Sequence, residues 1–134
     1  MISMTFSIRG NHENQAGNPI PYTRTLSHSW TKSAARYKDW MEYVRIEFLR
    51  SFQSARRGSV PVTLDGHLEL ARGQTAEISL HVTWANGAHG DLDNVLKGVL
   101  DSLFVQDKEI VKLTATSEKG KRGSVEGVII IHDL

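Results

Sequence analysis

The chain has 134 residues, a net charge of +1 and no cysteine. Because a single domain commonly has about 100–150 residues, we expect residues 1–134 to form one domain. The lack of cysteine excludes disulfides, thiolate metal sites and cysteine nucleophiles, so any metal must be held by oxygen or imidazole. No apolar run approaches the roughly 20 residues that span a bilayer, and the first ten residues do not read as a signal peptide. We therefore expect a soluble, cytoplasmic protein that does not enter a membrane.

Charge is distributed unevenly along the chain. Residues 1–60 carry nine Lys and Arg against four Asp and Glu, whereas residues 61–134 carry seven against eleven. A basic half beside an acidic half suits a polyanion held near a cation-binding carboxylate cluster. Asymmetry of this size also arises by chance, and charge alone favours that ordinary explanation.

The N-terminal half predicts a strand, a long loop and a helix. Residues 5–8 alternate between polar and apolar, which indicates a short strand. The polar segment from Gly10 to His28 predicts a loop long enough either to contact a ligand or to be a mobile surface segment. From about residue 29 or 31 to residue 52, apolar side chains recur every three or four positions. This spacing predicts an amphipathic helix whose aromatic stripe belongs to the core.

The C-terminal half alternates between strand and helix patterns. The predicted elements are strands at 64–70 and 77–84, a loop at 86–90, a helix at 92–103, a strand at 109–117, a turn at 118–124 and a strand at 125–132. The simplest way to bury their apolar faces is to pack both helices on one mixed sheet. We therefore predict a single-domain α+β (mixed α/β) fold.

The segment Asp91-Leu92-Asp93-Asn94 is the part of the chain most suggestive of chemistry. Leu92 begins the apolar stripe of the predicted helix, so Asp91 and Asp93 should both lie on its solvent side and can converge there. One Asp at a helix N-terminus is ordinary, because it accepts hydrogen bonds from free N–H groups. Two Asp followed by Asn and then Lys exceed what a cap requires, so a cation site is an alternative to an ordinary capped helix.

Lys97 and Asp107 extend this pattern. Lys97 lies four residues after Asp93, where it forms either a surface ion pair contributing about 0.2–0.5 kcal/mol or a cation that stabilises charge on a bound phosphate. Asp107 precedes the predicted strand at 109, where it is either a turn residue or a third carboxylate. Three oxygen ligands suit Mg²⁺, and such sites hydrolyse phosphodiesters.

Residues 90–103 closely resemble the central motif of the RusA family of Holliday-junction resolvases, in which Asp-Leu-Asp-Asn, a Lys and Asp-x-Leu follow one another. Residues 105–111 are similar to the family's acidic segment before a strand, and the order of elements agrees over most of the chain. This chain has Gln106 where the family usually has a first Asp. Its link from Leu103 to Asp107 is also shorter than is typical of the family.

The resemblance implies a homodimeric endodeoxyribonuclease that resolves four-way DNA junctions by paired symmetric nicks, in recombination and repair. It implies Mg²⁺ as the cofactor, with Mn²⁺ as an alternative, and a bacterial or phage setting. The family's metal-binding acids correspond to Asp91, Asp93 and Asp107, and its catalytic lysine corresponds to Lys97. A dimer also makes physical sense, because two symmetric nicks need two symmetric sites.

Two other functions stay open from the sequence. One is a branched-DNA-binding module without catalysis, and the other is a nuclease that acts on flaps or other branched DNA. His89 adjoins the acidic pair, although an ordinary loop histidine is the simpler interpretation. Six cations are candidate contacts to the DNA backbone, and each is also plausible as plain surface: Arg24, Arg56, Arg57, Lys119, Lys121 and Arg122.

Overall fold

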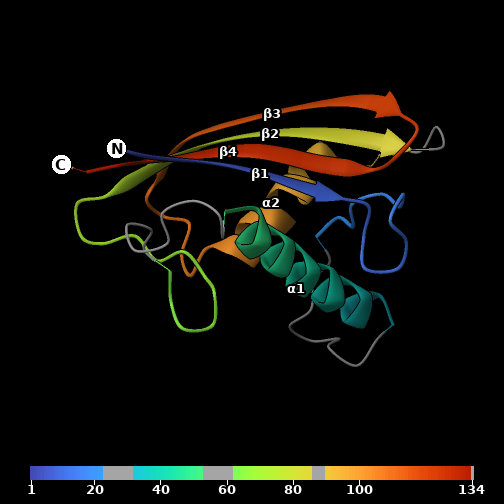
Figure 1. Cartoon of the computed structure of the whole chain (residues 1–134), viewed down its shortest axis with the longest axis horizontal. Coiled ribbons are helices and arrows are strands. Elements are labelled where there is room, and N and C mark those ends of the chain that lie inside the picture. Colours follow the sequence, from blue (N-terminus) through green and yellow to red (C-terminus); the bar gives the residue numbers. More distant parts are fainter. Residues whose placement is uncertain (23–31, 53–61, 86–89, 134) are drawn as a thin grey trace.

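The computed structural model describes residues 1–22, 32–52, 62–85 and 90–133. They form one small α+β domain with a four-stranded mixed sheet and two helices, which confirms the predicted fold class. Both helices lie against one face of the sheet and leave the other face open (Figure 1). In chain order the elements are β1 (Ile2–Arg9), α1 (Lys32–Phe52), β2 (Thr75–Ala85), α2 (Leu92–Leu103), β3 (Ile110–Gly120) and β4 (Ser124–His132).

The strand pairing determines where α2 begins and ends. The strands lie in the order β1-β4-β2-β3, with β4 antiparallel to both of its neighbours and β3 parallel to β2. Two parallel neighbours need a crossover connection, and α2 is that crossover. It therefore starts at the end of the sheet where β2 finishes, and leads back to the end where β3 starts (Figure 1).

The core lies between the helices and the sheet. Tyr37, Trp40, Val44 and Phe48 of α1 are buried, and their spacing of three and four residues is the stripe that the sequence predicts. The Phe48 ring packs edge-on against Phe6 of β1, with ring centroids 5.3 Å apart. The predicted assignment of this aromatic stripe to the core is confirmed.

The predicted strand at residues 64–70 is wrong. Only isolated bridges form there, pairing Val62 with Leu68 and Leu68 with Phe104. Between Val62 and Leu68 the chain turns at Gly66. Its φ is +90°, a backbone conformation that residues with a side chain rarely adopt. The alternation of Leu64, Leu68 and Leu70 suggested a strand, but Leu64 is fully exposed. By contrast, β3 is longer than predicted and leaves a turn of only three residues before β4.

The described part of the predicted loop, residues 10–22, is held by side-chain and backbone hydrogen bonds. The Asn11 side chain accepts from two backbone N–H groups and donates to the Asn18 carbonyl. Asn18 in turn bonds both the N–H and the carbonyl of Ala85 at the end of β2. The N–H of Gly123 donates to Ala16, and a Cβ on Gly123 would clash with the Gly17 carbonyl. These contacts fix the loop at the end of the sheet where α2 starts.

Candidate functional site

The acidic pair lies at the exposed start of α2. Asp91 is the N-cap, and its Oδ1 accepts from the N–H groups of Asp93 at 2.9 Å and Asn94 at 3.4 Å. Asp93 lies in the first turn and is exposed. Gly90, just before the cap, packs on Trp84, so an added Cβ would lie 2.9 Å from that ring. Capping therefore uses only the Oδ1 of Asp91. The carboxylates of Asp91 and Asp93 both lie at the surface, two residues apart in the chain.

Lys97 is held by an aromatic ring of the N-terminal loop. Its Nζ lies 4.8 Å from the centroid of Tyr22, a distance typical of a cation–π contact. Tyr22 is fixed on α2 by a backbone hydrogen bond to the Asn94 carbonyl at 3.0 Å, and its ring meets Tyr37 edge-on. Among the described residues Lys97 has no ion pair, so the predicted alternative of a surface pair with Asp93 is not formed. Tyr22 was not predicted from the sequence, where its only signal is an aromatic residue in a polar loop.

Asp101, one turn beyond Lys97, is the second residue that sequence analysis missed. Tyr37 crosses α2 at Gly98, where an added Cβ would lie 3.2 Å from its ring. The Tyr37 hydroxyl is buried beside the Asp101 carboxyl; burial raises its pKa, and the negative charge of Asp101 raises it further. Burial likewise raises the pKa of Asp101, and so does the charge of Asp107. Lys97 and Tyr37 act in the opposite direction, lowering it.

Asp101 gives a prediction for stability against pH. Because its pKa is raised in the folded state, folding takes up protons at this carboxyl, and the wild type loses stability as pH rises through the carboxylate range. Asp101→Asn lacks this penalty and is expected to melt at a higher temperature than the wild type near neutral pH. The difference should vanish in acid, where the carboxyl is protonated in both states. Thermal melts across this range check it, and a pH-independent difference would contradict it.

Asp107 lies at the other end of α2 from the acidic pair. Its carbonyl accepts from Ile110 in the turn before β3, and the neighbouring Glu109 carbonyl accepts from Ala76 at the start of β2. The charge of Asp107 raises the pKa of Asp101. Asp101 lies eight residues after Asp93, which is about 12 Å along the helix axis. Within the described ranges, no three His, Asp or Glu side chains are placed to hold a metal. One chain therefore does not assemble the three acids into the Mg²⁺ site that the resemblance implies.

The predicted DNA contacts divide into two groups. Arg24, Arg56 and Arg57 lie outside the described residues, as does His89. Lys119, Lys121 and Arg122 are exposed at the end of β3 and in the turn after it, and Lys119 pairs in register with Trp84 of β2. This second group therefore lies at the same end of the sheet as Asp91.

A cationic cavity of about 720 Å³ lies at this end of the molecule, between the loop, α1 and the β3–β4 turn. Its cations are Arg9, Arg50 and Arg122, and His12 is also part of the lining. Glu47 pairs with Arg50 at 3.0 Å, and Glu13 pairs with Arg36 at 2.8 Å. In the part of the chain that the structure describes, Arg9 and Arg122 have no carboxylate partner, so the cavity can accept an anion. Of these residues only Arg122 was predicted from the sequence, because the others are distant from it along the chain.

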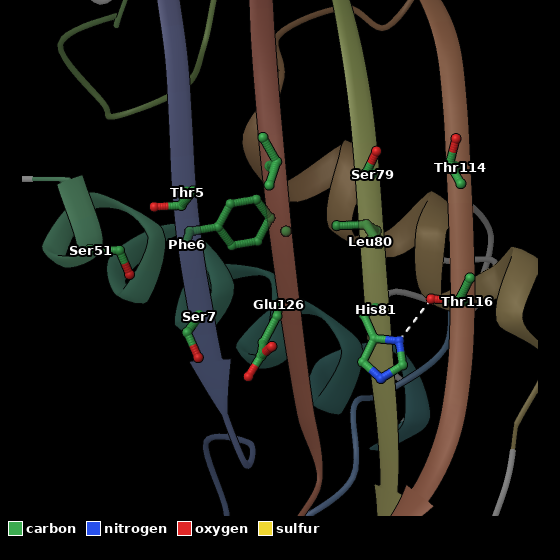
Figure 2. Close-up of a pocket in the computed structure, with 12 residues that line it drawn as sticks. Thr5, Phe6, Ser7, Ser51, Ser79, Leu80, His81, Thr114, Thr116 and Glu126 are labelled. Carbon is green, nitrogen blue, oxygen red and sulfur yellow. Dashed lines mark hydrogen bonds between the residues drawn. The ribbon is translucent and has the colours of Figure 1, made fainter.

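The open face of the sheet carries a second hollow, of about 690 Å³. Its hydroxyl side chains include residues of β1, β2 and β3, and Figure 2 shows the His81 ring beside Thr116. The His81 Nδ1 lies 2.7 Å from the Thr116 Oγ1. None of the predicted site residues lines this hollow.

No protein-family model matches the chain, and no curated protein matches it. The likeness to the RusA family therefore rests on the motifs at residues 90–113 and the order of elements. Neither helix in the described ranges is long and apolar enough to cross a membrane.

Proposed function

We propose that this chain is a Mg²⁺-dependent, structure-specific endodeoxyribonuclease that resolves four-way DNA junctions. The observation that carries the proposal is the pair of exposed carboxylates, Asp91 and Asp93, at the start of α2, with Lys97 fixed one turn further on the same helix. Mg²⁺ bound by such acids supplies an activated water and neutralises charge at the scissile phosphodiester. The choice of a four-way junction as substrate rests on the family resemblance.

The residues of one chain have separate tasks in this proposal. Asp91 and Asp93 present oxygen ligands of the kind a hard cation takes, and capping leaves most of their oxygens free. Lys97 stabilises negative charge on the phosphate, and Tyr22 limits the positions that its ammonium can adopt. Asp107 contributes the third acid, although within one chain it lies at the other end of α2 from Asp91 and Asp93. We further propose a homodimer and a cytoplasmic, bacterial or phage setting.

Arg9 and Arg122 supply a prediction for DNA binding. The double variant Arg9→Ala/Arg122→Ala removes the two cavity arginines that have no carboxylate partner among the described residues. It is expected to bind junction DNA more weakly, and the slope of log affinity against log salt should fall by about 0.9 for each lost phosphate contact. Titrations at several salt concentrations measure it. Arg72→Ala, an exposed arginine outside the cavity, is the matched control, and equal slopes in all three proteins would remove the cavity from the DNA-binding surface.

Cleavage of defined DNA tests the proposed function. A synthetic four-way junction, a linear duplex and a flap are incubated with wild type, Asp93→Asn or Asp39→Asn, each with Mg²⁺ or with EDTA. Asp39 is an exposed residue of α1 and serves as the matched control. We expect paired symmetric nicks in the junction that need Mg²⁺, persist in Asp39→Asn and disappear in Asp93→Asn.

The other possible outcomes of the cleavage experiment identify the alternative functions. Tight junction binding without nicks at any metal concentration would identify a DNA-binding module. Preferred cleavage of the flap would keep the nuclease and change its substrate. No binding to any branched DNA would reject the proposal.

A further inference from the structure

Lys97 does not pair with the acid that its position on α2 favours. Asp93 lies four residues before Lys97, the order in which an acid and a lysine on one helix attract each other best. Helical side chains also lean toward the N-terminus, which directs Lys97 toward Asp93. Yet Lys97 has no ion pair among the described residues, and its Nζ lies over the Tyr22 ring. The ammonium is therefore attracted from another side of the helix.

Helix geometry places Asp101 on that other side. With 3.6 residues per turn, successive residues lie about 100° apart around the helix axis. Asp93 then lies about 40° to one side of Lys97, and Asp101 lies about 40° to the other side. Because side chains lean toward the N-terminus, Asp101 leans back toward Lys97. The two acids therefore flank the ammonium and attract it in opposite directions.

Two tyrosines pack on the Asp101 side of the helix. Tyr22 donates its backbone N–H to the Asn94 carbonyl, and Tyr37 crosses the helix at Gly98. Around the axis, both helix positions lie on the same flank as Asp101. The two rings meet edge-on, with centroids 5.6 Å apart. The buried Tyr37 hydroxyl lies beside the Asp101 carboxyl, so one tyrosine supports both the ring under the ammonium and the acid next to it.

The charge of Asp101 lowers stability and acts on Lys97. Burial raises the pKa of Asp101, Lys97 lowers it and the charge of Asp107 raises it further. The net direction is upward, so the ionised carboxyl lowers the stability near neutral pH. Lys97 is the only cation among the groups of the described chain that shift this pKa. It is therefore the partner that the charge of Asp101 attracts.

We propose that Asp101 is a positioning residue for Lys97: together with the Tyr22 ring it holds the ammonium away from Asp93, which leaves the Asp93 carboxylate open to a divalent cation. An ammonium paired with Asp93 would compete with that cation for the same oxygens. The position of the ammonium is independent of any activity. The benefit to a bound cation rests on the proposed nuclease function.

NMR of the protein without DNA or metal tests the position of the ammonium. In the wild type the Tyr22 ring should shift the Lys97 ε-methylene signals upfield, because the end of this side chain lies over the ring. Asp101→Asn removes the charge and keeps the shape, so these signals should move downfield, toward those of an exposed lysine. Asp101→Glu keeps the charge and should retain most of the wild-type shift. Asp39→Asn, at an exposed position of α1, is the control.

Two results of this experiment would overturn the positioning role. One is an Asp101→Asn protein whose Lys97 signals stay at their wild-type positions. The other is an equal displacement in Asp101→Glu, which would assign the effect to packing rather than to charge.

Titration with Mn²⁺, again without DNA, tests the effect on a bound cation. Mn²⁺ broadens the NMR signals of nearby nuclei, so the amide signals of Asp93 and Asn94 report binding at the start of α2. Asp101→Asn should need about twice the Mn²⁺ concentration for half-maximal broadening, the competition expected from an ion pair four residues apart on a helix. Physiological salt screens the direct effect of the lost charge. In Lys97→Met no ammonium competes, and adding Asp101→Asn should change nothing.

The double variant separates positioning from a direct effect of charge. A loss of Mn²⁺ affinity that persists in Lys97→Met/Asp101→Asn would show that Asp101 attracts the cation itself, and would overturn a role through Lys97. Wild-type signals of Asp93 that no Mn²⁺ concentration broadens would overturn the role of this acid as a cation ligand.

Junction nicking separates this inference from the proposed function. Asp101→Asn should need about twice the Mg²⁺ concentration for half-maximal nicking, and saturating Mg²⁺ should restore the rate. The same half-maximal concentration as in the wild type would contradict the benefit to the cation. A wild type that cuts no branched DNA would end the nuclease proposal, and the Lys97 signals would still decide whether Asp101 positions the ammonium.

Discussion

Replacing Lys97 with methionine is expected to slow junction nicking by about 10²–10³-fold, the loss typical when one charge-stabilising group is removed. Methionine has a similar length and helix propensity, so α2 should keep its structure. The rate is measured in single turnover with saturating protein and Mg²⁺, and junction affinity is measured separately. Lys38→Met, an exposed lysine of α1, is the control. Nicking by Lys97→Met at the wild-type rate would exclude Lys97 from the chemistry.

The contact between Lys97 and Tyr22 gives a finer version of this experiment. Tyr22→Phe keeps the ring under the ammonium and should retain most of the activity, whereas Tyr22→Leu removes the ring and should lower the nicking rate. Because aromatic rings shift nearby resonances, the NMR signals of the Lys97 side chain should move in Tyr22→Leu and stay in Tyr22→Phe. Equal rates in the two variants would show that the contact does not position Lys97.

The largest expected loss of stability follows from Phe48→Ala. The Phe48 side chain is fully buried and packs against Phe6, and truncating such a side chain to alanine typically lowers the free energy of unfolding by about 3–5 kcal/mol. For a domain of this size that corresponds to a fall in Tm of roughly 10–20 °C. Calorimetry or urea titration measures the change.

A matched substitution on the same helix separates packing from helix propensity. Ile46 is 40% exposed, so Ile46→Ala should change the stability by less than about 1 kcal/mol. Similar losses at the two positions would contradict the assignment of this face of α1 to the core.

Local patterns predicted most of the fold. Both helices follow the spacing of their apolar residues, and β2 follows its alternation because one of its faces is buried. β4 was predicted from the continuous apolar run at residues 128–131. The predicted strand at 64–70 failed because alternation over a few residues does not reveal a turn at Gly66. β3 was predicted, but its exposure on both faces was not, since position at a sheet edge depends on the order of strands.

The candidate site was predictable only where its residues are close in sequence. Asp91, Asp93 and Lys97 share the start of α2, so helical geometry places them without knowledge of the fold. Tyr22 and Arg9 reach the same end through the docked loop and the end of β1, which no local pattern encodes. Asp107 is close to Lys97 in sequence, but the crossover carries it to the opposite end of the sheet.

The pairing of β1 with β4 constrains when the protein can fold during its synthesis. Ile2 lies beside Ile131 and Arg9 beside Ser124, so almost the whole chain must be made before this half of the sheet can close. Until then the buried face of β1, with Met4, Phe6 and Ile8, has no strand partner. Contacts between residues this distant in sequence slow folding. During synthesis β1 therefore stays without a strand partner until β4 has been made.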